Sequence, residues 1–430
     1  MTKRRILHAA DIHLDSPLQK LSQYEDAPVQ QIRDASRDAL NNLTDLAIDQ
    51  AVDLVVVAGD LYDGNWKETR TGMFFVKQAT KLRDAGIPIL VIRGNHDAAN
   101  IMTNSLPLPA NPDGSPIMMA DEKVDTRVFD DLGIAVHGRS FGKRAEKDGM
   151  VKHYPSPHSG MFNLGLLHTS LLGGDGHDPY APCTPAELTN KEYDYWALGH
   201  IHVRGEHGVA DGAPIVFSGN IQGRHINETG EKGCILVDID DKNQTKRTFH
   251  PLDVARWELC SIDASEMQST DDLLEAFGDW LAKQLPQVGD RLLVTRVRVH
   301  GNSPLHNKLH QRSRHIEDEL RAITISHGEG QTWLETFRVR TNVIADASLS
   351  VDMEGPMKSL SHVVGDLKSD PELAAIVATE LRNLAGKLPT EVSLCDEIGE
   401  DASQWAQELI AAASADLVGR LQGNGQEAGQ

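Results

Sequence analysis

The stretch ILVIRGNHDAAN, residues 89–100, begins as an apolar run and then changes at once to a glycine and three polar side chains that can bind metal ions. The aliphatic, β-branched start is typical of a short strand that is buried on both faces. Gly94 marks a turn at the end of this strand, and Asn95, His96 and Asp97 follow it directly. Functional groups collect beyond the carboxyl ends of strands in layered α/β proteins, so the stretch predicts such a fold with a site at the strand end.

The same pattern recurs through the first part of the chain. Further apolar runs end in polar residues at RILHAADIH (5–13), LVVVAGD (54–60), IAVHG (134–138), FNLGLLH (162–168), YWALGHIH (195–202), IVFSGN (215–220) and CILVDID (234–240). Residues 28–50 and 69–86 place apolar side chains near helical spacing, whereas the proline-rich residues 101–130 read as a long surface loop. This alternation predicts a layered α/β domain over residues 1–252.

The pattern changes near residue 255. Strands and helices alternate at 256–263, 271–285, 291–301, 305–322 and 333–341, which predicts a small α+β domain over residues 255–345. This domain carries many basic side chains: Arg291, Arg296, Arg298, Lys308, Arg312, Arg314, Arg321, Arg338 and Arg340. They either contact a phosphate backbone or line a solvated sheet face. Residues 350–422 predict a helical tail with apolar faces, and residues 423–430 should be disordered.

The composition is that of a folded soluble protein. A chain of 430 residues is long enough for two or three domains, and its 40% hydrophobic and 24% charged content is ordinary. The N-terminal apolar run is too short for a signal peptide, and no stretch approaches the roughly 18 apolar residues of a membrane span. The four cysteines show no paired spacing. We therefore expect a protein of the reducing cytoplasm that does not engage a membrane.

The charge balance limits the partners. A net charge of -21 argues against indiscriminate binding to nucleic acid, because the long-range field repels phosphate. It does not exclude a phosphate substrate, since a bound divalent metal reverses the local field in a site built from carboxylates. The chain has no GxxxxGK[ST] phosphate loop, which excludes a P-loop ATPase.

Five strand ends carry side chains that can bind metal ions. ADIHLD, AGDLYD, RGNHD, LLHTS and LGHIHVRG together supply seven oxygen and nitrogen donors: Asp11, His13, Asp60, Asn95, His168, His200 and His202. In the Asp-x-His and His-x-His motifs, residues two apart on an extended chain point to the same side, so each pair can address one metal or two adjacent ones. Gly59 and Gly94 leave room where the backbone turns beside ions and a phosphate. The set predicts a two-metal site.

The ligand types narrow the choice of metal. Carboxylate, imidazole and amide donors without thiolate favour manganese, iron or zinc. Two such ions about 3.5–4 Å apart polarise phosphoryl oxygens, activate water and stabilise an in-line displacement. Each motif alone has a structural interpretation: GNHD as a strand-end turn, His168 as a core histidine and GHIH as a surface turn. Five motifs that each occur once, in order and after a strand, favour the metal site.

The ordered motifs DIHLD, GDLYD, GNHD, LLHTS and GHIH resemble those of the calcineurin-like metallophosphoesterases. The forms DxHLD, GDLxD and GHxH are most similar to the SbcD-type DNA repair exonucleases, including the YhaO-like branch. The resemblance implies a β-sandwich flanked by helices, with the α+β domain as a DNA-facing cap. It also implies two ligand sets that share Asp60: Asp11, His13, Asp60 and His202 for one metal ion, and Asp60, Asn95, His168 and His200 for the other. Mn²⁺ is the expected metal, with Fe²⁺ or Zn²⁺ as alternatives.

By the same resemblance, His96 contacts the scissile phosphate and assists protonation of the leaving group. Imidazole suits this role because its unperturbed pKa of about 6.5 lies near neutral pH. Asp63, three residues after Asp60, either orients His96 or serves as a helix N-cap or turn residue. Asp97 is expected to be structural.

Three hypotheses about function can be weighed against this pattern. The branch-specific motifs and the basic α+β domain favour a manganese-dependent DNA exonuclease or endonuclease that acts in DNA repair. The alternative is a small-substrate metallophosphoesterase that cleaves nucleotides, cyclic nucleotides or phosphoprotein, since the metal site handles the phosphate and leaves the leaving group to the surrounding loops. A non-catalytic scaffold should lack at least one ligand, and every expected ligand is present.

The resemblance also implies partners. These are DNA and an SbcC-like coiled-coil ATPase subunit. The apolar helical faces after residue 356 either dock that subunit or pack on the cap domain. A homodimer, formed through helices of the first domain, is implied by the resemblance alone.

Overall fold

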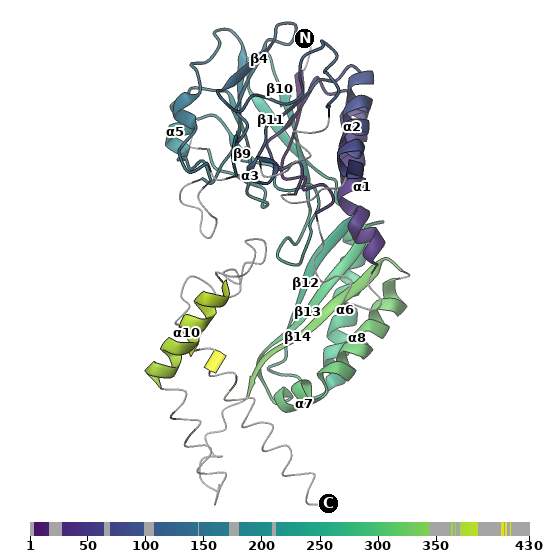
Figure 1. Ribbon diagram of the computed structural model, residues 1–430. Helices are drawn as coiled ribbons and strands as arrows, with labels where there is room; N and C mark the ends of the chain where they lie inside the picture. Colours follow the sequence, from purple (N-terminus) through teal and green to yellow (C-terminus); the bar gives the residue numbers. More distant parts are fainter. Residues whose placement is uncertain are drawn as a thin grey trace, which may run out of the picture. The chain divides into compact units, whose positions relative to one another are not determined.

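The computed structural model in Figure 1 describes residues 4–16, 28–63, 69–98, 107–171 except 145, 180–208, 212–343 except 329, 370–385 and a few single residues beyond 360. The chain divides into two compact units. The first unit consists of Met1–Glu258 with Val288–Val294, and the second consists of Leu259–Gln287 with Thr295–Gln430.

Two β-sheets form the centre of the first unit. One sheet has the order β11 (Thr245–Pro251), β10 (Gly233–Ile239), β1 (Arg4–Ala9), β2 (Leu54–Val57) and β3 (Ile89–Val91). The other has the order β4 (Asp125–Phe129), β5 (Ile134–Gly138), β6 (Phe162–His168), β7 (Tyr195–Gly199), β9 (Ile215–Phe217) and β8 (Gly205–Glu206). β1, β2 and β3 run parallel, as do β5, β6, β7 and β9, so their carboxyl ends share one edge of each sheet. All eight apolar runs contain a strand, as predicted.

The two sheets bury one apolar core between them. Ile6, Val56 and Leu90 of the first sheet pack with Val136 and Leu164 of the second. Helices α1 (Val29–Asp49) and α2 (Thr69–Asp84) cover the first sheet, and the short helix α5 (Pro185–Thr189) covers the second, so Figure 1 shows helices on both sides. Each fully buried Val, Leu or Ile contributes about 1.5–3 kcal/mol. The predicted α/β fold, a layered β-sandwich flanked by helices, is confirmed.

Helix α1 shows how the sequence directs this layering. Its buried residues, among them Ile32, Ala39, Leu43 and Ala47, recur at three- or four-residue spacing and form one stripe. That stripe packs on the first sheet. Ala51 takes a φ of 46° just after the helix, the left-handed conformation that commonly ends helices.

Three strands of the first unit were not predicted. β4, β8 and β11 lie at the edges of the two sheets. Their side chains are half-buried or exposed, so their sequences lack an apolar run. The prediction of a loop throughout 101–130 is therefore wrong for β4, which pairs with β5.

The second unit contains most of a three-stranded sheet and its helices, while the first residues of β12 and β13 are counted in the first unit. The sheet has the order β12 (Ala255–Asp263), β13 (Leu292–Ser303) and β14 (Thr332–Val343), and the helices are α6 (Thr270–Val288), α7 (His306–Gln311) and α8 (Ser313–Gly328). The single helix predicted over 305–322 is two helices, because Arg312 leaves the helical conformation with φ −107° and ψ 18°. The remaining elements follow the predicted order.

Helix α10 (Pro371–Ala385) is the described helix of the predicted tail. Apart from single residues, the rest of 350–422 and all of 423–430 lie outside the described residues. In the part of the chain that the structure describes, no helix is long and apolar enough to cross a membrane.

Candidate metal centre

The loops that follow β1 and β2 run side by side at the carboxyl edge of the first sheet. The backbone N–H of Asp11 donates to the carbonyl oxygen of Gly59 at 3.0 Å. The backbone N–H of His13 donates in the same way to Asp60 at 3.0 Å. These hydrogen bonds bring two predicted ligands of one loop against the predicted bridging ligand of the other.

Four of the predicted ligands lie on unusual backbone. The φ angle is 51° at Asp11, 44° at His13, 52° at Asp60 and 101° at His200. Positive φ is uncommon in residues other than glycine and clusters at functional sites, where the surrounding structure holds it in place. The prediction that the backbone is extended in the Asp-x-His and His-x-His motifs is therefore wrong. Both strands end before these motifs begin, and left-handed turns aim the side chains.

Two glycines allow the loops to approach this closely. A side chain at Gly59 would place its Cβ 2.4 Å from His168 Nδ1, and one at Gly94 would place its Cβ 2.3 Å from Asp60 Oδ1. Gly59 also has a φ of 95°, which glycine adopts without strain. The positions of His168 and Asp60 thus depend on the absence of a side chain at both residues.

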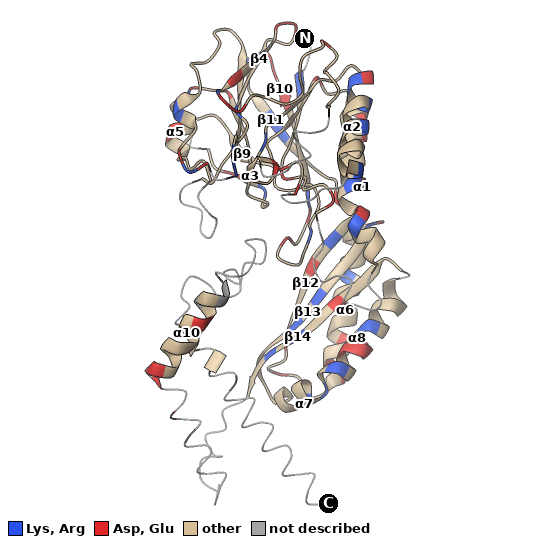
Figure 2. Ribbon diagram, viewed as in Figure 1, with Lys and Arg blue, Asp and Glu red and all other residues tan. Residues whose placement is uncertain are grey.

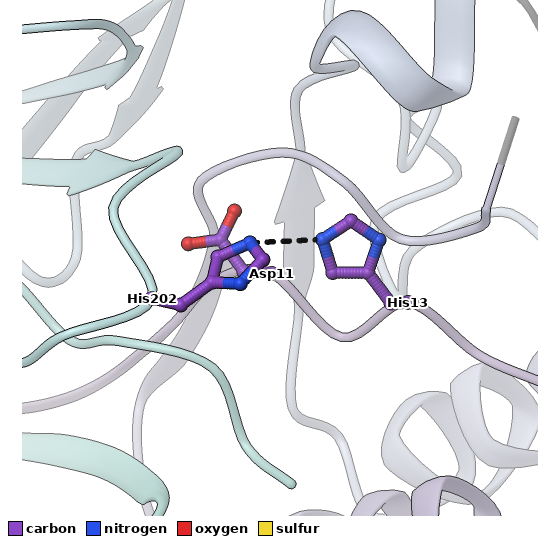
Figure 3. A group of neighbouring side chains, drawn as sticks. All are labelled: Asp11, His13 and His202. Carbon is purple, nitrogen blue, oxygen red and sulfur yellow. Dashed lines mark hydrogen bonds between the residues drawn. The ribbon is translucent and has the colours of Figure 1, made fainter. Parts of the chain in front are cut away.

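His13 and His202 face each other through their ring nitrogens, as Figure 3 shows. The two Nε2 atoms are 3.2 Å apart, and a carboxylate oxygen of Asp11 belongs to the same group of atoms. Asp60 Oδ2 lies 3.8 Å from His13 Nε2. Two imidazole nitrogens and the Asp11 carboxylate therefore gather around one point, and Asp60 lies beside them next to His13.

A second group of donors forms around His168. Its Nε2 lies 3.0 Å from Asn95 Oδ1 and 3.4 Å from Asp60 Oδ2. Its Nδ1 donates to the carbonyl oxygen of Ala58 at 2.9 Å, so Nε2 is the nitrogen that faces the centre. The ring of His200 packs edge-on against that of His168, with centroids 5.2 Å apart. All seven predicted ligands are thus brought together, and Asp60 Oδ2 lies close to both His13 and His168, at 3.8 and 3.4 Å.

The buried carboxylates at this centre need positive charge nearby to compensate them. Asp11 and Asp60 are each 1% exposed, yet among the described residues no lysine or arginine lies within ion-pair distance of either. Burial raises the pKa of Asp11. Burial alone would also raise the pKa of Asp60, but His168 and His96 outweigh it and hold that pKa well below its ordinary value. Buried like charges are costly unless compensated, so the donor set fits divalent metal ions.

His96 lies beside this centre and is paired with Asp63. His96 Nδ1 is 2.7 Å from Asp63 Oδ1, and the Ser16 hydroxyl donates to Asp63 Oδ2. This contact is the one that the orienting role of Asp63 requires. Burial lowers the pKa of His96, but the charges of Asp60 and Asp63 outweigh it and leave the pKa above its ordinary value. With Nδ1 engaged, Nε2 is the ring nitrogen that can transfer a proton.

Two further carboxylates of the motifs brace the loops. Asp97 lies in the short helix α3 (Asn95–Ala98), accepts three backbone N–H groups at 2.8–3.1 Å and joins the loop after β2 to the start of this helix. Asp15 accepts hydrogen bonds from Arg37 of α1 and Thr71 of α2. The loop that carries His13 is thereby tied to both helices.

Sequence reasoning missed two charged residues at the centre, Arg224 and Glu228. Glu228 Oε1 lies 2.7 Å from His202 Nδ1, and the Arg224 guanidinium donates to the same oxygen at 2.9 Å. Both side chains lie in the loop between β9 and β10, with exposed fractions of 13% for Arg224 and 6% for Glu228. The only signal was the Arg-x3-Glu spacing in GRHINE, which ordinarily reads as a solvated loop.

The layered fold and this centre define a class, the metal-dependent phosphoesterases. The family model of the calcineurin-like phosphoesterases matches residues 4–204, and that of the middle domain of metallophosphoesterase YhaO matches residues 257–342. The uncharacterized metallophosphoesterase YhaO of Bacillus subtilis (strain 168) is 32% identical over 304 residues, which cover 71% of this chain and 73% of that protein. The chain belongs to the calcineurin-like phosphoesterase family, whose members are hydrolases that bind divalent metals.

More distant relatives are named for DNA repair. The DNA double-strand break repair protein Mre11 of Sulfolobus acidocaldarius is 26% identical over 381 residues, which cover 84% of this chain and 89% of that protein. The Mre11 protein of Methanopyrus kandleri is 24% identical over 289 residues, which cover 63% of this chain and 61% of that protein. The former match extends well beyond the phosphoesterase unit.

Proposed function

We propose that this protein is a metal-dependent exonuclease or endonuclease that hydrolyses phosphodiester bonds of DNA in DNA repair. The observation that carries the proposal is the Asp63-paired His96 beside a buried ligand set, an arrangement that can act on a phosphodiester and protonate its leaving oxygen. For DNA as the substrate, the support is the similarity to Mre11 proteins, which for the Sulfolobus protein covers 84% of this chain.

In this proposal seven side chains would hold two metal ions, and Asp60 would belong to both ligand sets. Asp11, His13, Asp60 and His202 would hold one ion, and Asp60, Asn95, His168 and His200 would hold the other. Mn²⁺ suits this mixture of carboxylate, imidazole and amide donors, and Fe²⁺ or Zn²⁺ are alternatives. When bound, the two ions supply Lewis-acid polarisation of the phosphoryl group and activation of the attacking water.

The protein's own acid is His96. Its Nε2 proton passes to the leaving oxygen as the phosphodiester is cleaved, while Asp63 holds Nδ1 and so fixes the direction of the ring. The charges of Asp60 and Asp63 raise the pKa of His96 despite its burial, which keeps the proton available near neutral pH. A positioned acid of this kind accelerates a reaction about 10²–10⁴-fold.

The second unit supplies a surface for the phosphate backbone. Arg298, Arg338 and Arg340 have exposed side chains on β13 and β14, where Figure 2 marks basic residues along the strands. Arg296, in contrast, is paired with Glu335 through two contacts of 2.7 Å and is neutralised within the sheet. We assign the backbone contacts to the three exposed arginines.

An SbcC-like coiled-coil ATPase subunit is the proposed protein partner, with the tail after residue 350 as the docking element. Deleting this tail should abolish recovery of the ATPase in a pull-down from mixed purified proteins. Unchanged recovery would rule out the tail as the docking element. A homodimer and a cytoplasmic location belong to the same proposal.

The first test is Mn²⁺-dependent cleavage of labelled single- and double-stranded DNA by the purified protein, with p-nitrophenyl phosphate esters as small substrates. Asp60→Ala and His96→Ala should lose DNA cleavage, whereas His153→Ala, at an exposed histidine away from the centre, should retain it. Metal-dependent ester hydrolysis without DNA cleavage, still sensitive to His96→Ala, would support the small-substrate phosphoesterase instead. Adding the purified ATPase partner then tests whether the nuclease is silent without it.

A further inference from the structure

Glu228 occupies a fixed position beside the predicted ligand His202. One carboxylate oxygen, Oε2, accepts the side-chain N–H of Asn220 at 2.9 Å and the backbone N–H of Arg224 at 2.8 Å. The other, Oε1, faces His202 Nδ1 at 2.7 Å and the Arg224 guanidinium at 2.9 Å. With 6% of its side chain exposed, Glu228 has little freedom to choose other partners.

The contact with Glu228 determines which nitrogen of His202 is presented to the centre. A carboxylate paired with a guanidinium is an acceptor, so Nδ1 of His202 must carry the hydrogen. Its Nε2 then has a free electron pair, and this is the atom that lies 3.2 Å from His13 Nε2. The Arg224 NH2 group lies 3.2 Å from Nδ1 and could donate to it only if Nδ1 carried no hydrogen. That tautomer would set the Nδ1 electron pair against Glu228 Oε1 at 2.7 Å, so the NH2 group is instead assigned as a donor to this oxygen.

The Arg224 guanidinium also reaches the partner of His96. Its NH1 group lies 3.7 Å from Asp63 Oδ2, while Asp63 Oδ1 holds His96 Nδ1 at 2.7 Å. One buried cation therefore lies between two carboxylates, each of which orients a histidine of the centre. Planar guanidinium can contact both at once, whereas an ammonium group offers a single point of charge.

We propose that Arg224 and Glu228 are positioning residues, in which Glu228 fixes the tautomer of His202 and Arg224 holds Glu228 and Asp63 in place. The inference rests on the proposed two-metal centre. Metal-ligating histidines commonly donate their second N–H to a carboxylate, and loss of such a partner lowers metal affinity about 10–100-fold. Glu228 should thus act on metal binding, and Arg224 on metal binding and on the His96 step together.

Calorimetric titration of the full chain with Mn²⁺, in the absence of DNA, tests the role of Glu228. Glu228→Gln keeps the size of the side chain and should weaken the binding of one of two ions about 10–100-fold. The matched control is Glu206→Gln, which removes a carboxylate from an exposed pair with Arg247 that has contacts of 3.0 and 3.1 Å. The control should bind Mn²⁺ like the wild type.

Arg224 is tested with two variants. Arg224→Met should weaken Mn²⁺ binding and also lower kcat at saturating Mn²⁺, because Asp63 loses a contact that metal cannot restore. Arg224→Lys should recover most of the metal affinity and less of kcat, since one ammonium cannot reach both carboxylates. Arg247→Met is the matched control and should change neither quantity.

The outcomes separate this inference from the proposal beneath it. If the wild type binds two Mn²⁺ ions and a folded Glu228→Gln binds them equally well, the positioning role is overturned, whether or not DNA is cleaved. If Arg224→Met affects metal affinity alone, the link to Asp63 is overturned. If the wild type binds no Mn²⁺, the two-metal proposal fails and this inference fails with it.

Discussion

The metal centre of the first unit and the arginine-bearing sheet of the second are both rich in charge, but they hold that charge in opposite ways. At the centre, Asp11 and Asp60 are almost fully buried and lie among fixed partners. In the sheet, Arg298, Arg338 and Arg340 extend into solvent. Buried charges interact strongly and demand compensation, whereas exposed charges are screened by salt. Single residues should therefore decide the rate at the centre, while no single arginine should decide binding on the sheet.

The largest effect is expected at His96. His96→Ala should lower kcat for DNA cleavage about 10²–10⁴-fold, because the proton donor is removed. Asp63→Asn should lower kcat less, and the double variant should be no slower than His96→Ala, since Asp63 acts through the histidine. The measurement is a double-mutant cycle at saturating Mn²⁺. Strictly additive losses would show that Asp63 works independently of His96.

Metal removal should lower the thermal stability of the first unit and leave that of the second unchanged. The donors of the centre all lie in the first unit, so bound metal should stabilise that unit by about 2.7 kcal/mol at a concentration 100-fold above the dissociation constant. Differential scanning calorimetry with and without a chelator should show one unfolding transition moving to lower temperature and the other staying in place. Equal shifts in both transitions would contradict the assignment of the metal to the first unit.

A buried histidine outside the centre should make the first unit sensitive to acid. Burial lowers the pKa of His8 to about 3, well below its ordinary value. Below about pH 6.5 the unfolded chain binds a proton that the folded chain does not, so stability falls by about 1.4 kcal/mol per pH unit, or on the order of 2 kcal/mol at pH 5. His8→Gln should flatten this dependence in urea unfolding, and the exposed control His153→Gln should not. If the free energy of unfolding of His8→Gln depends on pH as steeply as that of the wild type, His8 is not the source of the acid sensitivity.

The smallest effect is expected on the exposed sheet. The double change Arg338→Gln with Arg340→Gln should weaken binding of single-stranded DNA only modestly and reduce the slope of log K against log salt by about 0.7 per lost phosphate contact. Fluorescence anisotropy across a salt series gives both quantities. Arg314→Gln, an exposed arginine on α8, is the matched control. The same slope in all three proteins would exclude these strands from the DNA-binding surface.

The comparison also explains which parts of the fold could be read from the sequence. The interior strands, and β3 at one edge of the first sheet, were predictable because burial on both faces requires an unbroken apolar run, as in LVVVAGD of β2. The edge strands β4, β8 and β11 carry mixed side chains, since one side of each strand meets solvent, and such a pattern resembles a loop.

The candidate site also has features that could be predicted from the sequence and features that could not. Its seven donors were predictable because each lies at or just after the end of a strand, in a motif of unusual chemistry. The unusual φ angles of His13 and His200 were not predictable, because no residue type other than glycine reliably signals a left-handed backbone in the sequence. Arg224 and Glu228 were missed because their partners His202 and Asp63 are distant in sequence, and only the folded chain shows that this pair is buried.

The hydrogen bond between the backbone N–H of His200 and the carboxylate of Asp11 joins residues 189 positions apart. During synthesis the first donor of the centre is made long before the last. Asp11 can accept the hydrogen bond from His200 only after β7 has been translated and has packed in place. The metal pocket therefore cannot exist in the emerging chain until more than two hundred residues of sequence, through His202, have been made. Metal binding by the complete set of donors therefore requires that the loops after β1 and β7 have first come together.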